Sequence, residues 1–346
     1  MHDLTRTRLE AILAGCATRA IGVVGDLGLD AYWHADMTRS FLSRETPHFA
    51  RPIVRETYSP GAGANVADNL KALGVGRVAV FSVFGDDWRG ALLRQVMAER
   101  GIDVGHLVIT PERFTTAYIK PMLMGYDSQQ EDARLDFENA APLTPTLEDA
   151  LLDAVTRQLP HLDALLVADQ LEVNGIVSDR VREGLNAMAA ANPGKLFLVD
   201  SRLRIGQYTS MILKPNWVEA IAAVHPGRDR RSVPREELAG VAATLNARTG
   251  RPVFVTLSED GALVYADGQA RHIPAGPTRP PLDPVGAGDT FIAALAGALT
   301  SGATPWEAGA MANLAASVTV EKLNQTGTAT PAEILARFAL RDLSAD

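Results

Sequence analysis

Three small residues followed by an acid form the stretch of this sequence best suited to chemistry. In DPVGAGDTF, at 283–291, Gly286, Ala287 and Gly288 lead directly into Asp289, and the apolar run FIAALAGAL follows. This pattern predicts the start of a helix, where unpaired N–H groups and the positive end of the helix dipole attract an anion. The small residues would let a phosphate approach closely, and Asp289 could accept a proton beside it. The alternative is an acid that only stabilises the first turn.

The elements that would position this stretch are short apolar segments alternating with helical patterns. Such alternation predicts an α/β fold with a parallel sheet and helices on both faces. The expected strands are 20–25, 78–84, 164–169, 195–200, 211–214 and 252–258. Expected helices include 62–73 and 88–101. Sheets of this kind bind ligands beyond the carboxyl ends of their strands, which is where an anion-binding helix start would be useful.

Two segments interrupt the alternation. Residues 31–58 hold no convincing helix, and residues 114–138 read as two extended segments around a polar turn at 125–130. We expect both to belong to a small β lid over the main sheet, with ordinary surface excursions as the alternative. No internal repeat or linker marks a boundary, so we expect a single domain over residues 1–346.

Composition argues against several function classes. The net charge of the 346 residues is −8 and no long basic run occurs, so we expect no nucleic-acid partner. No apolar run approaches the ~20 residues of a membrane span, and the first residues lack the apolar core of a signal peptide. Cys16 is the one cysteine, which is typical of a reducing compartment. We therefore expect a cytoplasmic protein without a membrane partner.

Several motifs, in the right order, resemble the signatures of the ribokinase-like (PfkB) family of carbohydrate kinases over roughly residues 18–340. DPVGAGDTF is similar to the C-terminal signature, which implies that Asp289 is the catalytic base and that residues 286–288 form the anion hole. GAGANVADNLKALG, at 61–74, is similar to the N-terminal signature. The resemblance implies a three-layer α/β/α fold with a mostly parallel central sheet and a small β lid. It also implies an ATP-dependent transfer of a phosphoryl group to a sugar hydroxyl.

The resemblance assigns a first group of residues to the sugar. It implies contacts from the acids of GDLGLD and from the start of the 61–74 motif, namely Asp26, Asp30, Gly61, Gly63 and Asn65. Each polar side chain has a structural alternative. Acids at a strand end can cap the following turn, and Asn65 can satisfy backbone groups early in its helix.

A second group of residues is assigned to ATP and Mg²⁺. The resemblance implies a nucleotide site made of Asn216, Thr256, Ser258, Gly261 and Asn313, although the family more often has glycine where Ser258 stands. The N-x-x-E element of Asn216 and Glu219 would organise Mg²⁺, and Glu219 could reach the metal through water or be a surface helix residue. A monovalent cation is an additional candidate cofactor.

Within the family, the chain is most similar to the kinases that phosphorylate D-glycero-beta-D-manno-heptose 7-phosphate for ADP-heptose synthesis. The similarity is carried by GDLGLDAYW (25–33), SRETP (43–47), QQEDARLDFE (129–138) and EKLNQTGT (321–328). The sequence departs from these relatives near Leu323, where two extra residues interrupt the usual K-L-G-T, and it does not include a nucleotidyltransferase domain. We expect heptose 7-phosphate, phosphorylated at its anomeric hydroxyl.

A phosphorylated sugar needs a cation at the far end of its pocket. Arg44, Lys120 and Arg134 lie on the expected lid segments and could pair with that phosphate, or be exposed lid charges of little energetic value. Two other functions stay open: a PfkB-type kinase for another sugar or nucleoside, and a non-catalytic sugar-binding regulator on the same scaffold. The expected partners are a small-molecule sugar or sugar phosphate and, by resemblance, a second copy of the chain bound through the lid.

Overall fold

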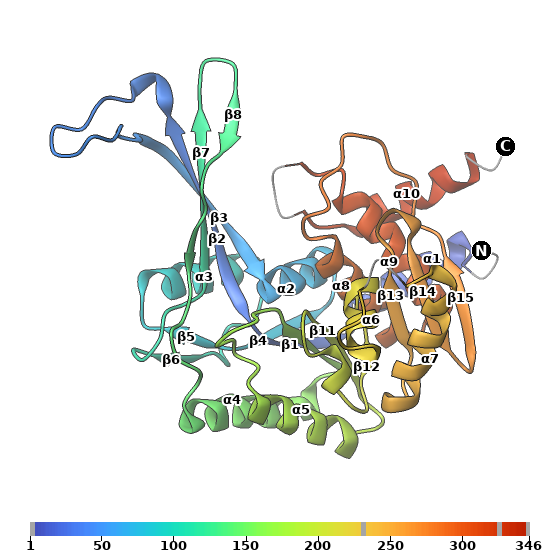
Figure 1. Cartoon of the computed structure of the whole chain (residues 1–346). Coiled ribbons are helices and arrows are strands. Elements are labelled where there is room, and N and C mark those ends of the chain that lie inside the picture. The colour runs from blue at the N-terminus through green and yellow to red at the C-terminus, as the bar shows by residue number, and fades with distance from the viewer. Residues whose placement is uncertain (1–3, 230–232, 324–326, 344–346) are drawn as a thin grey trace.

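A twisted eight-stranded sheet forms the centre of the computed structural model, which describes residues 4–229, 233–323 and 327–343 (Figure 1). The strand order is β15-β14-β13-β12-β11-β10-β1-β4; the neighbours from β4 to β13 are parallel, whereas β14 pairs antiparallel with both β13 and β15. The bounds are β1 (Ala20–Gly25), β4 (Arg77–Phe81), β10 (Ala164–Asp169), β11 (Leu196–Ser201), β12 (Ile212–Leu213), β13 (Val253–Thr256), β14 (Ala262–Ala266) and β15 (Gln269–Ile273). The predicted α/β fold with a mostly parallel sheet is confirmed.

Helices cover both faces of the sheet, so the molecule has three layers (Figure 1). One layer consists of α4 (Pro145–Gln158), α5 (Asp179–Ala191), α6 (Trp217–Val224) and α7 (Leu238–Thr249). The other consists of α1 (Arg6–Cys16), α2 (Gly63–Ala72), α3 (Trp88–Glu99), α8 (Ala287–Thr300), α9 (Pro305–Thr319) and α10 (Pro331–Leu343). Because both faces are covered, a central strand such as β10 is buried at every residue. None of the helices that the structure describes has the length and apolarity needed to cross a membrane.

Short 3-10 helices complete the described elements. They are η1 (Met37–Arg39), η2 (Leu159–His161), η3 (Ile205–Gln207), η5 (Arg235–Glu237) and η6 (Ser258–Asp260).

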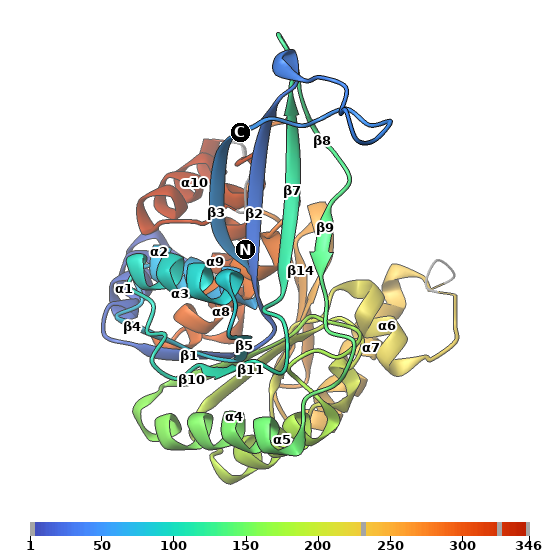
Figure 2. The ribbon, with the colours of Figure 1, turned by 90° about the vertical axis from the view of Figure 1, so that its left-hand side faces the viewer.

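A second sheet rises from the body as the lid, and its long strands run side by side in two perpendicular views (Figure 1, Figure 2). It consists of β2 (Leu27–Asp36), β3 (Ile53–Ala62), β7 (Ala117–Met124), β8 (Gln129–Glu131) and β9 (Leu135–Phe137). The first lid segment was expected at 31–58, but β2 starts earlier and β3 ends later. β2 follows Asp26 directly, without a loop, and β3 contains the first glycine of the GAGAN motif. β3 forms one edge of the lid, and its first five residues are exposed.

The segment predicted as one strand over 78–84 is divided in two. β4 ends at Phe81, and β5 (Val83–Gly85) pairs with β6 (Val108–Thr110) in a separate sheet. The chain changes partners at Ser82, whose hydroxyl donates to the Gly25 carbonyl and whose own carbonyl accepts from the Val108 N–H. The apolar pattern continues across this point, so the sequence alone did not reveal the change.

Candidate functional site

Asp289 lies in the first turn of α8, whose N-cap residue is Gly286. Gly286 has a φ of +79°, a left-handed conformation that favours glycine, and its carbonyl accepts the Thr290 N–H. Two side-chain amides donate to the Asp289 carboxylate: Nδ2 of Asn65 lies 2.7 Å from Oδ2, and Nε2 of Gln170 lies 3.0 Å from Oδ1. The two glycine-containing motifs of the sequence are therefore in direct contact.

The surroundings of Asp289 favour a carboxyl group that takes up a proton more readily than usual. Burial raises the pKa of Asp289 to about 6. The charge of Asp200 also raises it, whereas the hydrogen bonds from Asn65 and Gln170 and the charge of Lys214 lower it. A carboxylate with a pKa near neutrality is suited to accept a proton from an attacking hydroxyl.

A buried lysine lies beside the small residues that precede Asp289. Lys214 follows β12 and is 4% exposed, and its Nζ lies 2.7 Å from Oδ2 of Asp200. A Cβ at Gly288 would lie 3.3 Å from the same Nζ, so the ammonium group runs alongside the first turn of α8. The Ala287 N–H donates to the Pro284 carbonyl. A positive charge next to a helix N-terminus is a favourable place for an anion.

The lid contributes a second acid close to the body. Asp30 on β2 forms an ion pair with Lys120 on the neighbouring strand β7, with 3.1 Å between Oδ2 and Nζ. Gly61 lies beside this pair, and a Cβ there would come within 2.8 Å of Oδ1 of Asp30. Gly63 begins α2, and its N–H donates to the Asp26 carbonyl at 2.7 Å. The residues predicted for the sugar thus gather at the foot of the lid.

Asp26 differs from Asp30 in its contacts. It is 1% exposed, and its carboxylate accepts the backbone N–H groups of Gln170, Leu171 and Ile176 at 2.8, 2.8 and 2.6 Å. Burial raises the pKa of Asp26 to about 6, against the effect of these hydrogen bonds. These contacts hold the loop that follows β10 and not the turn after Asp26 itself, so they differ from the capping alternative. A contact between Asp26 and a sugar stays a prediction.

Asn216 and Glu219 form a reciprocal cap at the start of α6. Oδ1 of Asn216 accepts the Glu219 N–H at 2.9 Å, and Oε2 of Glu219 accepts the Asn216 N–H at 2.8 Å. Burial, aided by the charge of Asp200, raises the pKa of Glu219 to about 7. Across the part of the chain that the structure describes, no three His, Cys, Asp or Glu side chains are grouped to hold a metal. A carboxylate oxygen suits Mg²⁺, which often takes its other ligands from phosphates and water.

Four of the predicted nucleotide residues lie at the end of β13, in the turn after it, and on α9. The Thr256 N–H donates to the Pro215 carbonyl at 3.0 Å, next to Asn216. Ser258 has a φ of +57°, a conformation that favours glycine, which explains why glycine would suit this position. Gly261, with a φ of +91°, packs so closely that a Cβ would lie 2.3 Å from the Ile273 carbonyl oxygen. Asn313 donates to the carbonyls of Ile273 and Pro274 at 2.8 and 3.1 Å.

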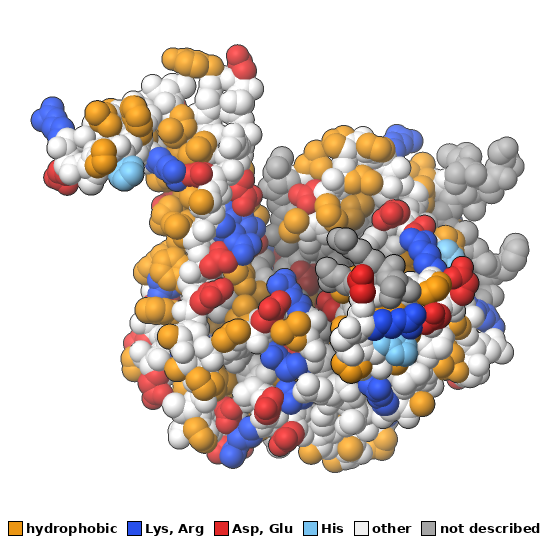
Figure 3. Space-filling view, in the orientation of Figure 1, with side chains coloured by type: hydrophobic (Ala, Val, Ile, Leu, Met, Phe, Trp, Pro, Cys, Tyr) orange, Lys and Arg blue, Asp and Glu red, His pale blue; other side chains and the backbone are white. Residues whose placement is uncertain are grey.

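The three cations predicted for a distal phosphate lie at different places. Lys120 is next to Asp30 and also lies 3.2 Å from the Tyr32 hydroxyl. Arg134 is exposed and binds Asp136 through two hydrogen bonds of 2.6 Å. Arg44 is exposed in the loop that joins η1 to β3 at the outer end of the lid (Figure 1). Basic and acidic side chains occupy the hollow between lid and body (Figure 3).

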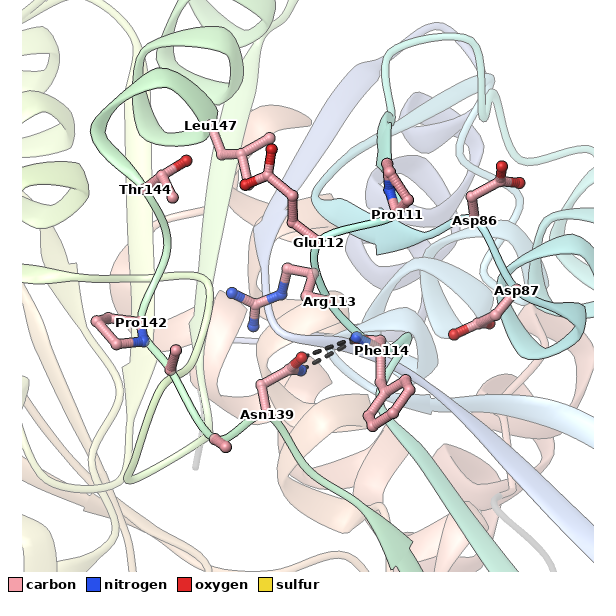
Figure 4. Close-up of a pocket in the computed structure, with 12 residues that line it drawn as sticks. Asp86, Asp87, Pro111, Glu112, Arg113, Phe114, Asn139, Pro142, Thr144 and Leu147 are labelled. Atoms are coloured by element: carbon pink, nitrogen blue, oxygen red, sulfur yellow. Dashed lines mark hydrogen bonds between the residues drawn. The ribbon is translucent and has the colours of Figure 1, made fainter.

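A cavity of about 480 Å³ lies at the base of the lid (Figure 4). Its lining includes residues 111–114 before β7, residues 139–142 after β9, and Asp86. The Asn139 side chain joins the two loops, since it pairs with both the N–H and the carbonyl of Phe114. Asp289 and Asp30 do not line this cavity, so it marks where the lid meets the body rather than the site around the base.

Sequence reasoning missed three residues of the site. Lys214 precedes the Asn216 motif within KPNWVEA, so its place in that motif was an available signal. Asp200 ends a predicted strand and Gln170 directly follows one, and no motif pointed to either residue. Their roles emerge only from the parallel sheet, which brings the ends of β10 and β11 next to α8.

The chain is similar to known proteins over nearly its whole length. The family model described as pfkB family carbohydrate kinase matches residues 32–333. The Bifunctional protein HldE of Trichlorobacter lovleyi is 31% identical over 99% of this chain and 67% of its own length. That of Geotalea uraniireducens is 33% identical over 97% of this chain and 66% of its own length. The chain therefore spans about two thirds of these relatives.

Solved structures support the fold independently. Phosphofructokinase-2 from Escherichia coli, in complex with potassium, has a TM-score of 0.70 at 19% identity and covers 94% of this chain and 99% of its own. Ribokinase from Thermotoga maritima has a TM-score of 0.65 at 20% identity and covers 93% and 99%. Together with the matched family model, these findings confirm the ribokinase-like fold. The chain belongs to the pfkB family of carbohydrate kinases, ATP-dependent phosphotransferases that act on a sugar hydroxyl.

Proposed function

We propose that this kinase transfers the γ-phosphoryl group of ATP to the anomeric hydroxyl of heptose 7-phosphate. The observation that carries the proposal is the placement of Asp289, held by Asn65 and Gln170 and flanked by Lys214, at the foot of a lid that presents Asp30 and Lys120. The sequence motifs shared with heptose 7-phosphate kinases and the identity to HldE proteins support this choice of sugar.

In the proposed reaction the sugar lies between the lid and the body, oriented by Asp30 and by the segment from Gly61 to Asn65. Asp289 accepts the proton of the attacking sugar hydroxyl. The hydroxyl oxygen forms a bond to the γ-phosphorus of ATP while the bond between that phosphorus and the bridging oxygen of ADP breaks. The N–H groups of Gly286 and Gly288 and the ammonium group of Lys214 stabilise the charge on the transferring group. ATP extends along the predicted nucleotide residues, Asn216, Thr256, Ser258, Gly261 and Asn313.

Mg²⁺ would enter with ATP. Bound to the phosphates, it supplies charge neutralisation. Glu219, fixed by its reciprocal cap with Asn216, is the side chain that would hold the water ligands of Mg²⁺.

A monovalent cation is a further part of the proposal, because a structural neighbour was solved with potassium. Replacing KCl by choline chloride in the assay tests it, and an unchanged rate would remove the cation from the proposal.

The experiment that tests the substrate is ADP release over a panel of acceptors: heptose 7-phosphate, the unphosphorylated heptose, fructose 6-phosphate, ribose and a nucleoside. We expect the highest kcat/KM with heptose 7-phosphate. A preference for an unphosphorylated sugar would exclude the heptose phosphate and leave the kinase class intact. If no acceptor in the panel leads to ADP release while sugar binding persists, the result would favour the non-catalytic sugar-binding regulator.

The distal phosphate is proposed to pair with a lid cation, and Lys120 is the best placed because it lies beside Asp30. The measurement is the ratio of kcat/KM for matched phosphorylated and unphosphorylated sugars in Lys120→Ala, Arg134→Ala and Arg44→Ala. A true phosphate contact should lower this preference by about 1.5–3 kcal/mol in at least one variant. Three unchanged ratios would show that these residues are only lid charges.

We further propose that two copies pair through their lids and that the enzyme is cytoplasmic, where ATP is available. Apolar side chains gather at the outer end of the lid (Figure 3), where Phe41, Leu42 and Phe49 are 60%, 57% and 67% exposed. An exposed apolar group of this kind is typical of an interaction surface.

A further inference from the structure

The loop over residues 170–176 follows β10 and carries a side chain that contacts the proposed base, Asp289. Its first residue, Gln170, is 9% exposed and donates from Nε2 to Oδ1 of Asp289 at 3.0 Å. Asn65 donates to the other oxygen, Oδ2, at 2.7 Å. Each carboxylate oxygen of the base therefore has its own amide donor, and the two donors come from distant parts of the chain.

Asp26 holds both ends of this loop. Oδ2 of Asp26 accepts the N–H groups of Gln170 and Leu171, and Oδ1 accepts that of Ile176. The loop closes tightly on the carboxylate, since a Cβ at Gly175 would come within 2.8 Å of Oδ1. Three donors on a side chain that is 1% exposed make Asp26 an anchor for the loop.

The middle of the loop is attached to the base of the lid. The Asn174 carbonyl accepts from Nη2 of Arg113 at 2.9 Å, and the Asn174 side chain donates to the Asn139 carbonyl at 2.8 Å. Asn139 in turn pairs with the backbone of Phe114 (Figure 4). Phe114 precedes β7 and Asn139 follows β9, so the loop is tied to both ends of the second lid segment.

We propose that Gln170 is a positioning residue for the base Asp289, and that Asp26 acts on catalysis through Gln170 by holding the loop that carries it. The inference rests on the proposed role of Asp289. A carboxylate with a donor on each oxygen has a fixed orientation toward the attacking hydroxyl, and misplacing a reacting group by about 1 Å can cost about 100-fold in rate. The proposal makes Asp26 a determinant of kcat rather than of sugar affinity.

The pH dependence of kcat/KM provides a second readout, because the groups around Asp289 set its pKa. Burial raises the pKa of Asp289 and Asp200 raises it further, while Asn65, Lys214 and Gln170 lower it. Removing the Gln170 donor should therefore move the acid limb of the kcat/KM profile to higher pH. A residue that only fills space would leave this limb in place.

The first test is Gln170→Met, which keeps a similar length and loses the donor. We expect kcat to fall by about 10- to 100-fold, KM for ATP and sugar to stay within about twofold, and the acid limb to shift to higher pH. Gln95→Met is the matched control, because Gln95 is exposed on α3. A wild-type kcat with an unmoved limb in Gln170→Met would overturn the proposal.

The second test is a double-mutant cycle with Asp26→Asn, which weakens the hold on the loop. If Asp26 acts through Gln170, the double variant should be about as slow as the slower single variant. A raised sugar KM in Asp26→Asn, with effects that multiply in the double variant, would place Asp26 on the sugar and overturn the proposal. Should Asp26→Asn fail to fold, Gln170→Met decides alone.

The outcome for the proposed base is separable. Wild-type turnover by Asp289→Asn would overturn that base together with this inference. Loss of turnover in Asp289→Asn without any effect of Gln170→Met would overturn this inference only.

Discussion

At the scale of single residues, the proposed chemistry depends on the carboxylate of Asp289, whose neighbours shift its pKa in opposite directions. Burial and Asp200 favour the protonated form of Asp289, whereas the two amides and Lys214 favour the ionised form. The balance leaves a group that is mostly ionised at neutral pH and still basic enough to accept a proton.

The most direct prediction at this scale concerns Asp289→Asn. The amide keeps the shape of the side chain and cannot accept the proton, so kcat should fall by about 10²–10⁴-fold. ATP affinity, measured by calorimetry, should stay near that of the wild type, because the predicted nucleotide residues are untouched. A variant that retains more than half of the wild-type kcat would remove Asp289 from the mechanism.

The pH dependence follows from the same group. Asp289 can act only when deprotonated, so kcat/KM should be constant above its pKa of about 6 and fall about tenfold per pH unit below it. ATP affinity measured over the same pH range corrects for titration of the phosphates. A rate that stays constant down to pH ~4.5 would show that the limiting base is an ordinary, solvated carboxylate.

At the scale of elements, the predicted nucleotide loop between β13 and β14 relies on backbone conformations that few residues adopt. Gly261 has a φ of +91° and a ψ of −121°, and a Cβ there would meet the Ile273 carbonyl oxygen at 2.3 Å. Gly268 in the next turn also has a positive φ, +72°, yet a Cβ there would meet nothing within 4 Å. Gly268 therefore measures the cost of a positive φ without a close contact, whereas Gly261 combines an unusual φ/ψ pair with one.

We expect Gly268→Ala to lower the free energy of unfolding by about 1 kcal/mol, the cost of a left-handed alanine. Gly261→Ala should cost more than about 2 kcal/mol and weaken ATP binding, since the backbone must shift away from Ile273. Urea denaturation and ATP calorimetry on both variants measure this. Equal losses of stability would show that the close contact at Gly261 is easily relieved.

The elements also show what the sequence could and could not provide. The parallel sheet and the helix that follows Asp289 were predictable, because buried strands and an apolar helix start leave local patterns. The division at Ser82 left no such pattern, since it depends on which strand lies alongside. Gln170 and Lys214 were missed for a related reason: their contacts with α8 or its first turn join residues that are far apart in the chain. Motif resemblance supplied Asp30 and Asn65, but it could not separate the contacts of Asp26 from those of Asp30.

At the scale of the whole molecule, the lid is the part whose surface most resembles an interface. We expect Leu42→Glu/Phe49→Glu to convert the proposed dimer into a monomer, because two buried charges would oppose apolar contact. Light scattering after size-exclusion chromatography measures the change in mass. Ile109→Glu on β6 is the control, since Ile109 is 40% exposed away from the lid. A wild type that is monomeric at all concentrations would contradict the lid dimer.

The exposed outer half of β3 has a consequence for how the protein aggregates. This strand lies at the edge of the lid, so the backbone N–H and C=O groups on its outer side offer a template for another strand, and Ile53 and Val54 are 41% and 46% exposed there. An uncovered edge of this kind recruits other chains without any prior unfolding of the body. When dilution or a substitution makes the protein monomeric, aggregation should therefore begin at the lid while the eight-stranded sheet stays folded. A second copy that covers this edge would thus also increase the protein's solubility.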